Sequence, residues 1–146
     1  MRILCPAFFF LCVIACGQNP STLSSENPSV LLEHPIGKLC TATDPNFDGY
    51  RYSEHIAHCQ RNVPRELKDA VAKRYAVKSS DFHLYQFDHY IPLNSGGADD
   101  IDNIWPQPLE QAHQKDDFEL KIFEELSAGT LTQAGAIAKI KAWKPI

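Results

Sequence analysis

The chain has 146 residues, of which 44% are hydrophobic, and a formal net charge of −4. This length and composition fit one globular domain with an additional segment. The acidic balance and the lack of a long basic run exclude a protein that holds nucleic acid through a highly basic surface, so any such binding should be weak, non-specific and sensitive to salt.

The additional segment is the N-terminus. Met1 and Arg2 precede an almost wholly apolar stretch, residues 3–15 (ILCPAFFFLCVIA). This stretch is shorter than the roughly 20 residues that a spanning helix needs, which excludes a transmembrane helix and favours a secretory signal. It ends in VIACG, which resembles the bacterial lipobox, where a lipidated Cys becomes the mature N-terminus; here that residue is Cys16. An ordinary signal peptide with a chance Cys is the alternative.

Residues 18–35 are rich in Ser, Asn and Pro and hold little that could form a core, which is typical of a tether. We therefore expect a signal peptide (1–15), a lipidated tether (16–36) and a monomeric domain (37–146). The protein would be exported and held on a membrane of the bacterial cell envelope only by acyl chains on Cys16. The outer membrane is preferred, because Gly17 stands where an Asp favours inner-membrane retention.

Cysteine usage agrees with export. Three of the five cysteines belong to the leader and anchor, namely Cys5, Cys12 and Cys16. The remaining two, Cys40 and Cys59, are expected to form a disulfide, and the loop of about 20 residues that they close would stabilise the domain by roughly 3 kcal/mol. A zinc site with His55 and His58 is the alternative, although the tight Cys pair of such sites is missing. We expect the two histidines on a short helix.

The middle of the chain predicts a helix followed by two strands. Residues 62–64 predict a helix start, with Pro64 at the first helical position and a basic outer face behind it. Aromatic and β-branched residues predict a strand over Phe82–Ile91. Gly and Asx residues predict a loop over Asn94–Asp100, and a short strand around Ile104 should end before the prolines at 106 and 108.

Two helices close the chain. Apolar spacing predicts one over Leu109–Leu126. Thr130 and Gln133 have the spacing of a capping box and predict the start of the last helix. The order around residue 90 is therefore strand, loop, strand, helix.

The segment Asp88–Glu119 contains the runs DHYIPLNSGG, NIWPQP and KDDFE. In this order of elements the runs resemble the HNH nucleases, and in particular small bacterial HNH proteins that contain DH-x-IPL-x-x-GG, N-x-WPQP and KD-x-x-E. The resemblance implies an α+β fold, a mainly helical small domain around a ββα-metal motif that grips one divalent metal ion.

The resemblance makes His89 the general base, Asp88 a metal ligand and Asn103 the residue that braces the loop and orients His89. A helix residue would complete the metal site; His113 is the candidate and Gln111 the alternative. Imidazole accepts a proton from water near neutral pH, because its ordinary pKa is about 6.5. A hard divalent cation suits carboxylate, imidazole and amide donors. We expect Mg²⁺ or Mn²⁺, with Zn²⁺ or Ni²⁺ as alternatives.

Three further acids, Asp99, Asp100 and Asp102, lack the calcium-loop pattern and are expected to be solvated. Residues 81–146 hold 11 acidic residues against five Lys or Arg, whereas residues 35–80 hold eight basic against five acidic. Nucleic acid should therefore meet the basic part, through Arg61 and Arg65, with Lys115 near the scissile phosphate.

The expected function is a metal-dependent HNH endonuclease that hydrolyses phosphodiester bonds, in DNA rather than RNA, with little sequence specificity. The alternative is a lipoprotein whose HNH fold serves as a binding or structural module without turnover, since a fold does not guarantee an activity.

Overall fold

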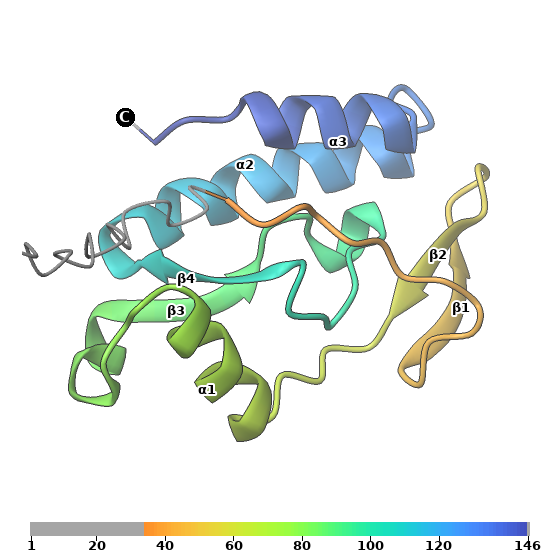
Figure 1. Cartoon of the computed structure of the whole chain (residues 1–146). Coiled ribbons are helices and arrows are strands. Elements are labelled where there is room, and N and C mark those ends of the chain that lie inside the picture. Colours follow the sequence, from red (N-terminus) through yellow and green to blue (C-terminus); the bar gives the residue numbers. More distant parts are fainter. Residues whose placement is uncertain (1–33, 146) are drawn as a thin grey trace, which may run out of the picture.

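The computed structural model describes residues 34–145 (Figure 1). The elements follow in the order β1 (Phe47–Arg51), β2 (Ile56–Cys59), α1 (Arg65–Arg74), the 3₁₀ helix η1 (Ser79–Leu84), β3 (Tyr85–His89), the 3₁₀ helix η2 (Leu93–Ser95), β4 (Ile104–Pro108), α2 (Leu109–Ser127) and α3 (Gln133–Ala142). Helices combined with small antiparallel sheets confirm the α+β class. No helix between residues 34 and 145 is both long and apolar enough to cross a membrane. The predicted signal peptide, Cys16 and most of the tether lie outside the described residues.

The β3–β4 sheet lies between α1 and α2, and α3 packs on the far side of α2 (Figure 1). Side chains of β3 alternate between the two faces of the sheet. Phe87 points to the face covered by α1, where it joins Val71 and Ile104 in the first core cluster. Asp88 points to the opposite face, where Lys115 of α2 meets it. The central sheet therefore carries an apolar face and a face with charged groups.

Helices α2 and α3 enclose the second core cluster. Ile122 and Leu126 of α2 pack against Ala136 of α3 and Ile56 of β2. Helix α2 ends one residue beyond the expected Leu126, so its prediction is confirmed. Helix α3 begins later than expected, because Thr132 rather than Thr130 accepts the capping bond, from the backbone N–H of Gly135 at 3.2 Å.

The segment around His55 and His58 was wrongly expected to be helical. It belongs to the antiparallel hairpin of β1 and β2, with His58 in β2 and His55 in the turn. Tyr52 and His55 have φ angles of 59° and 57°. These left-handed conformations reverse the chain within a few residues, which an α-helix does not allow.

The prolines of β4 were wrongly expected to stop that strand. Pro106 and Pro108 lie within it and pair in register with Phe87 and Tyr85. β4 has only one strand neighbour in the described structure, and an edge strand tolerates residues that lack an N–H. Strand β3 is shorter than the expected Phe82–Ile91, since residues 79–84 form η1.

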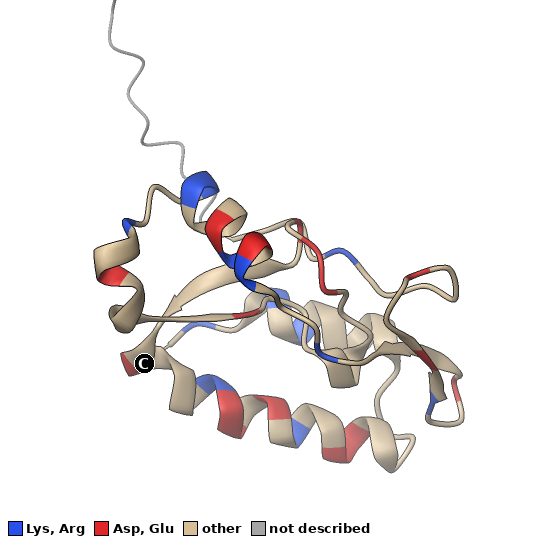
Figure 2. Cartoon of the chain, turned by 90° about the horizontal axis from the view of Figure 1, so that it is seen from below, with Lys and Arg blue, Asp and Glu red and all other residues tan. Residues whose placement is uncertain are grey.

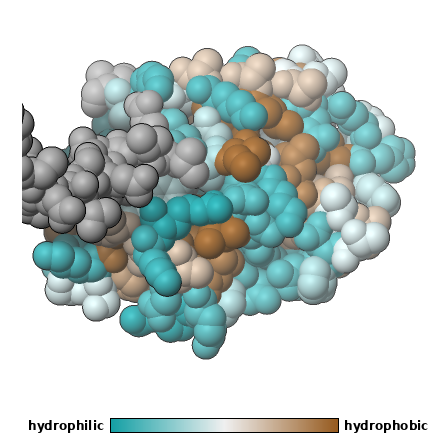
Figure 3. Space-filling model, in the orientation of Figure 1, coloured by the Kyte–Doolittle hydropathy of each residue, from teal (hydrophilic) through white to brown (hydrophobic). Residues whose placement is uncertain are grey.

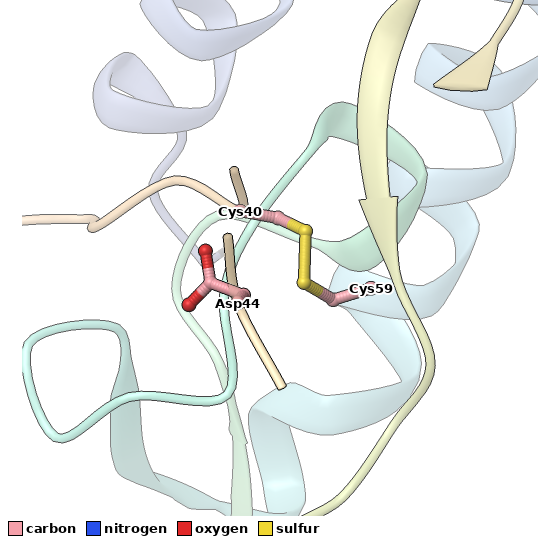
Figure 4. A group of neighbouring side chains, drawn as sticks. All are labelled: Cys40, Asp44 and Cys59. Atoms are coloured by element: carbon pink, nitrogen blue, oxygen red, sulfur yellow. A yellow bond between two sulfur atoms is a disulfide. The ribbon is translucent and has the colours of Figure 1, made fainter. Parts of the chain in front are cut away.

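Residues 37–40 run along the loop between β3 and β4. The backbone N–H groups of Gly37 and Cys40 donate to Asp102 and Gly96, both at 2.8 Å, and Ala98 donates back to Lys38 at 3.0 Å. The disulfide Cys40–Cys59, drawn in Figure 4, joins this segment to the hairpin and confirms the predicted pair. The loop is thereby held between the N-terminal segment and the core.

Candidate active site

Asn103 closes the loop between β3 and β4. Its side chain is fully buried; Oδ1 accepts from the N–H of Ile91 at 2.8 Å, and Nδ2 donates to the carbonyl groups of Ile91 and Ala98 at 3.0 Å. Gly97 is required in this loop because a Cβ there would lie 1.7 Å from the Ile91 carbonyl oxygen. Asn103 thus braces the loop and positions its ends instead of touching the ring of His89.

His89 stands at the end of β3 with its side chain 3% exposed. Its Nε2 lies 2.9 Å from Oδ1 of Asp99, and its Nδ1 lies 3.2 Å from Nη1 of Arg61. A guanidinium group can only donate hydrogen bonds, so Nδ1 of His89 must be the acceptor. The proton of the neutral ring therefore sits on Nε2, which donates to Asp99.

Asp99 was expected to be solvated, and this expectation is wrong. Its side chain is 2% exposed. Besides the bond to His89, its Oδ2 accepts from the backbone N–H of Asn62 at 3.0 Å and from Nδ2 of Asn46 at 3.2 Å. Asn46 and Asn62 flank the β1–β2 hairpin. A run of acids in a Gly-rich loop suggests solvent exposure, and only the packing of the hairpin over the loop reveals the buried partner.

The neighbouring acids pair at the surface. Asp100 accepts from Lys38 at 2.6 Å, and Asp102 accepts from Arg74 at 2.8 Å. Asp100 and Asp102 therefore fasten the outside of the loop, whereas Asp99 supports His89 from the inside.

Asp88 lies between two cationic side chains. Its Oδ2 is 3.0 Å from Nζ of Lys115, and its Oδ1 is 3.1 Å from Nη1 of Arg61. Burial by itself would raise the pKa of Asp88, but the ammonium group of Lys115 and the backbone N–H of His89 outweigh it and hold the pKa well below its usual range. Asp88 is therefore a carboxylate at neutral pH.

Lys115 was expected near the scissile phosphate, but it is buried, with its side chain 5% exposed. Its ammonium group donates to Asp88, to the carbonyl oxygen of His89 at 2.8 Å and to the carboxylate of Glu119. These three acceptors use all three of its protons. Lys115 is thus a structural partner of Asp88 and has no donor left for nucleic acid.

A surface hollow of about 220 Å³ opens beside Asp88 and His89. Its remaining lining residues are Arg61, Pro92, Leu93, Asn94 and Glu119. His113, the expected third metal ligand, is exposed on α2 and does not line this hollow; Gln111, the alternative, is absent from it as well. Arg61 is half-exposed at the rim.

Glu119 is the helix carboxylate that faces the hollow, and sequence reasoning missed it. The five residues of β4 carry the chain roughly 17 Å away from the site, where α2 begins. A helix that rises 1.5 Å per residue returns over that distance in about 11 residues, which leads from Pro108 to Glu119. Element lengths were therefore the signal that could have found it. Burial, together with the nearby Asp88 and Asp116, raises the pKa of Glu119 despite the charge of Lys115.

The donors around the hollow fit a hard divalent cation in kind. Asp88 and Glu119 offer carboxylate oxygens, and Asn94 offers an amide oxygen. The raised pKa of Glu119 reflects a carboxylate that is buried next to other negative charge, and a cation would relieve this cost. Asp88 and Glu119, not His113, are thus the residues that would hold such an ion.

A second group of possible ligands contains the disulfide, as Figure 4 shows: Cys40, Cys59 and the neighbouring Asp44. The two sulfur atoms are bonded to each other and are not available as thiolate ligands. The Asp44 carboxylate accepts from the N–H and the hydroxyl of Thr41. This arrangement is a disulfide beside a capped turn, and it removes the zinc alternative for the two cysteines.

No family model, no curated protein and no solved structure matches this chain. The residues themselves, with the contacts above, carry the functional proposal.

Proposed function

We propose that the chain is an HNH-type endonuclease that hydrolyses phosphodiester bonds in nucleic acid, DNA rather than RNA, with little sequence specificity. The observation that carries the proposal is the placement of the His89 ring at the wall of an open hollow, with Nε2 2.9 Å from Asp99 on the buried side and Nδ1 3.2 Å from Arg61. The order β3, loop, β4, α2 and the bracing by Asn103 support the resemblance to the ββα-metal motif.

His89 would act as the general base. Its Nδ1 takes the proton of a water molecule that attacks the phosphate, and the Asp99 carboxylate stabilises the imidazolium that forms. Arg61 covers Nδ1 in this structure, but its side chain is half-exposed at the rim. A phosphate entering the hollow would attract Arg61, and this movement frees Nδ1 for the water.

Asp88 and Glu119 would hold one divalent cation, with Mg²⁺ or Mn²⁺ proposed and Zn²⁺ or Ni²⁺ as alternatives. When bound, such an ion supplies positive charge against the phosphate oxygens and the leaving oxygen. The side chains keep the site close to neutral without it, because Arg61 and Lys115 pair with the carboxylates of Asp88 and Glu119.

A plasmid-nicking assay on the purified full-length chain tests the function. We expect relaxation of supercoiled DNA with magnesium or manganese, and a loss of at least about 100-fold in His89→Ala, because general-base catalysis contributes about that much. His113→Ala is the matched control, since His113 is exposed on α2, and it should keep full activity. No cleavage of the plasmid or of a single-stranded oligonucleotide with magnesium, manganese, zinc or nickel, or equal cleavage by His89→Ala, would contradict the proposal.

The second candidate is a catalytically silent HNH-fold module. The observation that favours it is the pairing of both Asp88 oxygens with cationic side chains. Calorimetric titration with Mn²⁺ separates the two: binding that is lost in Glu119→Gln supports the nuclease, and no binding together with no cleavage supports the silent module.

For location, we propose an exported lipoprotein held on the cell envelope by Cys16. Mass spectrometry of the mature N-terminus tests this claim, and an unmodified Cys16 rules out the anchor.

A further inference from the structure

A second hollow, which we call the β3 groove, adjoins the site through Arg61. It measures about 390 Å³ and is lined by Arg61, Arg65, Lys68, Phe82, Tyr85, Gln86 and Phe87. Arg61 lines both the β3 groove and the hollow beside His89. A ligand that occupies the groove therefore reaches the candidate active site.

One wall of the β3 groove is cationic. Arg61 precedes α1, and Arg65 and Lys68 lie on its first turns. Among residues 34–145, Lys68 has no ion-pair partner, so its charge is available to a phosphate. Arg65 pairs with Asp69 at 2.8 Å, but both groups are more than half exposed, and water weakens such a pair. Figure 2 shows basic and acidic segments alternating along α1.

Aromatic side chains line the same groove. Phe82 of η1 and Tyr85 at the start of β3 are half-buried, and the guanidinium of Arg65 stands 5.1 Å from the ring centre of Phe82. Tyr85 also lines a third hollow of about 420 Å³, together with Leu84 and Leu109, which are both about half exposed. The three hollows thus follow β3 from His89 to Tyr85, with Arg61 and Tyr85 as the shared residues.

From this succession of hollows we infer that the substrate is single-stranded nucleic acid, whose backbone follows Arg61, Arg65 and Lys68 while a base stacks on Tyr85. This inference rests on the proposed nuclease function. A groove that combines cationic side chains with aromatic rings is how proteins bind single strands without sequence preference. A duplex keeps its base faces stacked inside, where Tyr85 cannot reach them.

The rest of the surface agrees with a narrow ligand. Residues 81–146 carry more than twice as many acidic as basic residues, so this part of the domain disfavours a polyanion and leaves the cations beside α1 as the track. Exposed apolar side chains appear on the face in Figure 3 as separate patches between hydrophilic ones. Lys115 is buried and cannot contact a ligand in the β3 groove, whereas Lys68 lines that groove.

Fluorescence anisotropy on the full-length His89→Ala chain tests the inference, since this variant binds without cutting. The probes are a labelled single-stranded oligonucleotide and the duplex of the same sequence. We expect the single strand to bind at least about tenfold more tightly, because one base–aromatic stack contributes that much. Tyr85→Leu, which keeps an apolar side chain but no ring face, should remove this advantage, whereas Tyr85→Phe should retain it.

Two control variants share the chemistry but not the location. Tyr50→Leu changes an exposed tyrosine of β1, and Lys121→Ala changes an exposed lysine of α2. Neither should alter the affinity. Lys68→Ala should lower the slope of log affinity against log salt by about 0.7, the value for one phosphate contact on a single strand.

Duplex binding as tight as single-strand binding, or an equal loss in Tyr85→Leu and Tyr50→Leu, would overturn the inference. The nuclease proposal fails separately. If the chain cuts nucleic acid without a single-strand preference, the proposed function stands and the β3 groove is not the binding track. If the chain prefers the single strand through Tyr85 but never cuts, the β3 groove stands as a binding site and the nuclease proposal is wrong.

Discussion

Asp99 fixes which nitrogen of His89 carries the proton. Asp99 accepts from Nε2, and Nδ1 faces Arg61, a residue that can only donate. In Asp99→Asn the new amide can present its NH₂ group to Nε2, which favours the other tautomer and protonates Nδ1. We expect cleavage to fall by about 100-fold or more, as for a general base that loses its lone pair.

The readout that separates this effect from simple unfolding is the ¹⁵N chemical shift of the His89 ring, which reports the tautomer. The parent should show a protonated Nε2, and Asp99→Asn a protonated Nδ1. Asp100→Asn is the matched control, because Asp100 pairs with Lys38 at the surface. Unchanged ring shifts and activity in Asp99→Asn would contradict the role assigned to Asp99.

The sequence could place Asp88 and His89 near the end of a strand and Asn103 behind the loop, because those residues belong to one short local motif. It could not place Asp99, whose partners Asn46 and Asn62 are more than 35 residues away in sequence. Burial of a charged residue depends on such distant partners, and no local pattern encodes them.

Among the elements, the hairpin of β1 and β2 supports the site indirectly. Asn46 and Asn62, which hold Asp99, lie just outside the two strands. The disulfide fixes this hairpin against residues 37–40. Loss of the disulfide should therefore affect His89 as well as global stability.

We expect the double variant Cys40→Ser, Cys59→Ser to lose roughly 3 kcal/mol of unfolding free energy, measured by urea denaturation. Its cleavage rate should fall even under conditions where it stays folded, because Asp99 is less firmly held. Dithiothreitol should reproduce both effects in the parent chain and change nothing in the double variant. A folded, fully active double variant would show that the hairpin does not support the site.

Helix α2 could be predicted almost to the residue because its apolar spacing extends over five turns. The hairpin could not, since its strands have five and four residues and its turn relies on left-handed Tyr52 and His55. The prolines of β4 led to a wrong strand end for a related reason. A strand tolerates proline at the edge of a sheet, and its own sequence does not show whether it lies at an edge.

For the whole molecule, two carboxylates give opposite dependences of stability on pH. The folded pKa of Asp88 lies below its ordinary 3.8, so the stability it contributes is present above pH 3.8 and is lost as the pH falls towards the folded value. The folded pKa of Glu119 lies above its ordinary 4.5, so its contribution is present below pH 4.5 and is lost as the pH rises through the folded value.

Urea unfolding between pH 2 and 7 tests both signs. The stability advantage of the parent over Asp88→Asn should shrink as the pH falls below 3.8. The parent should lose stability relative to Glu119→Gln as the pH rises above 4.5. Asp117→Asn changes an exposed acid of α2 and serves as the control. Parallel pH curves for all four proteins would contradict the arrangement of charges around Lys115.

The contact of residues 37–40 with the β3–β4 loop has a mechanical consequence. A force that pulls on the N-terminal end meets the bonds from Gly37 and Lys38 to Asp102 first, and the bond from Cys40 to Gly96 last. Peeling stops at Cys40, because the disulfide is covalent. Tension would therefore reach the loop behind His89 before it reaches either core cluster, and the same disulfide sets how far the segment can be drawn away.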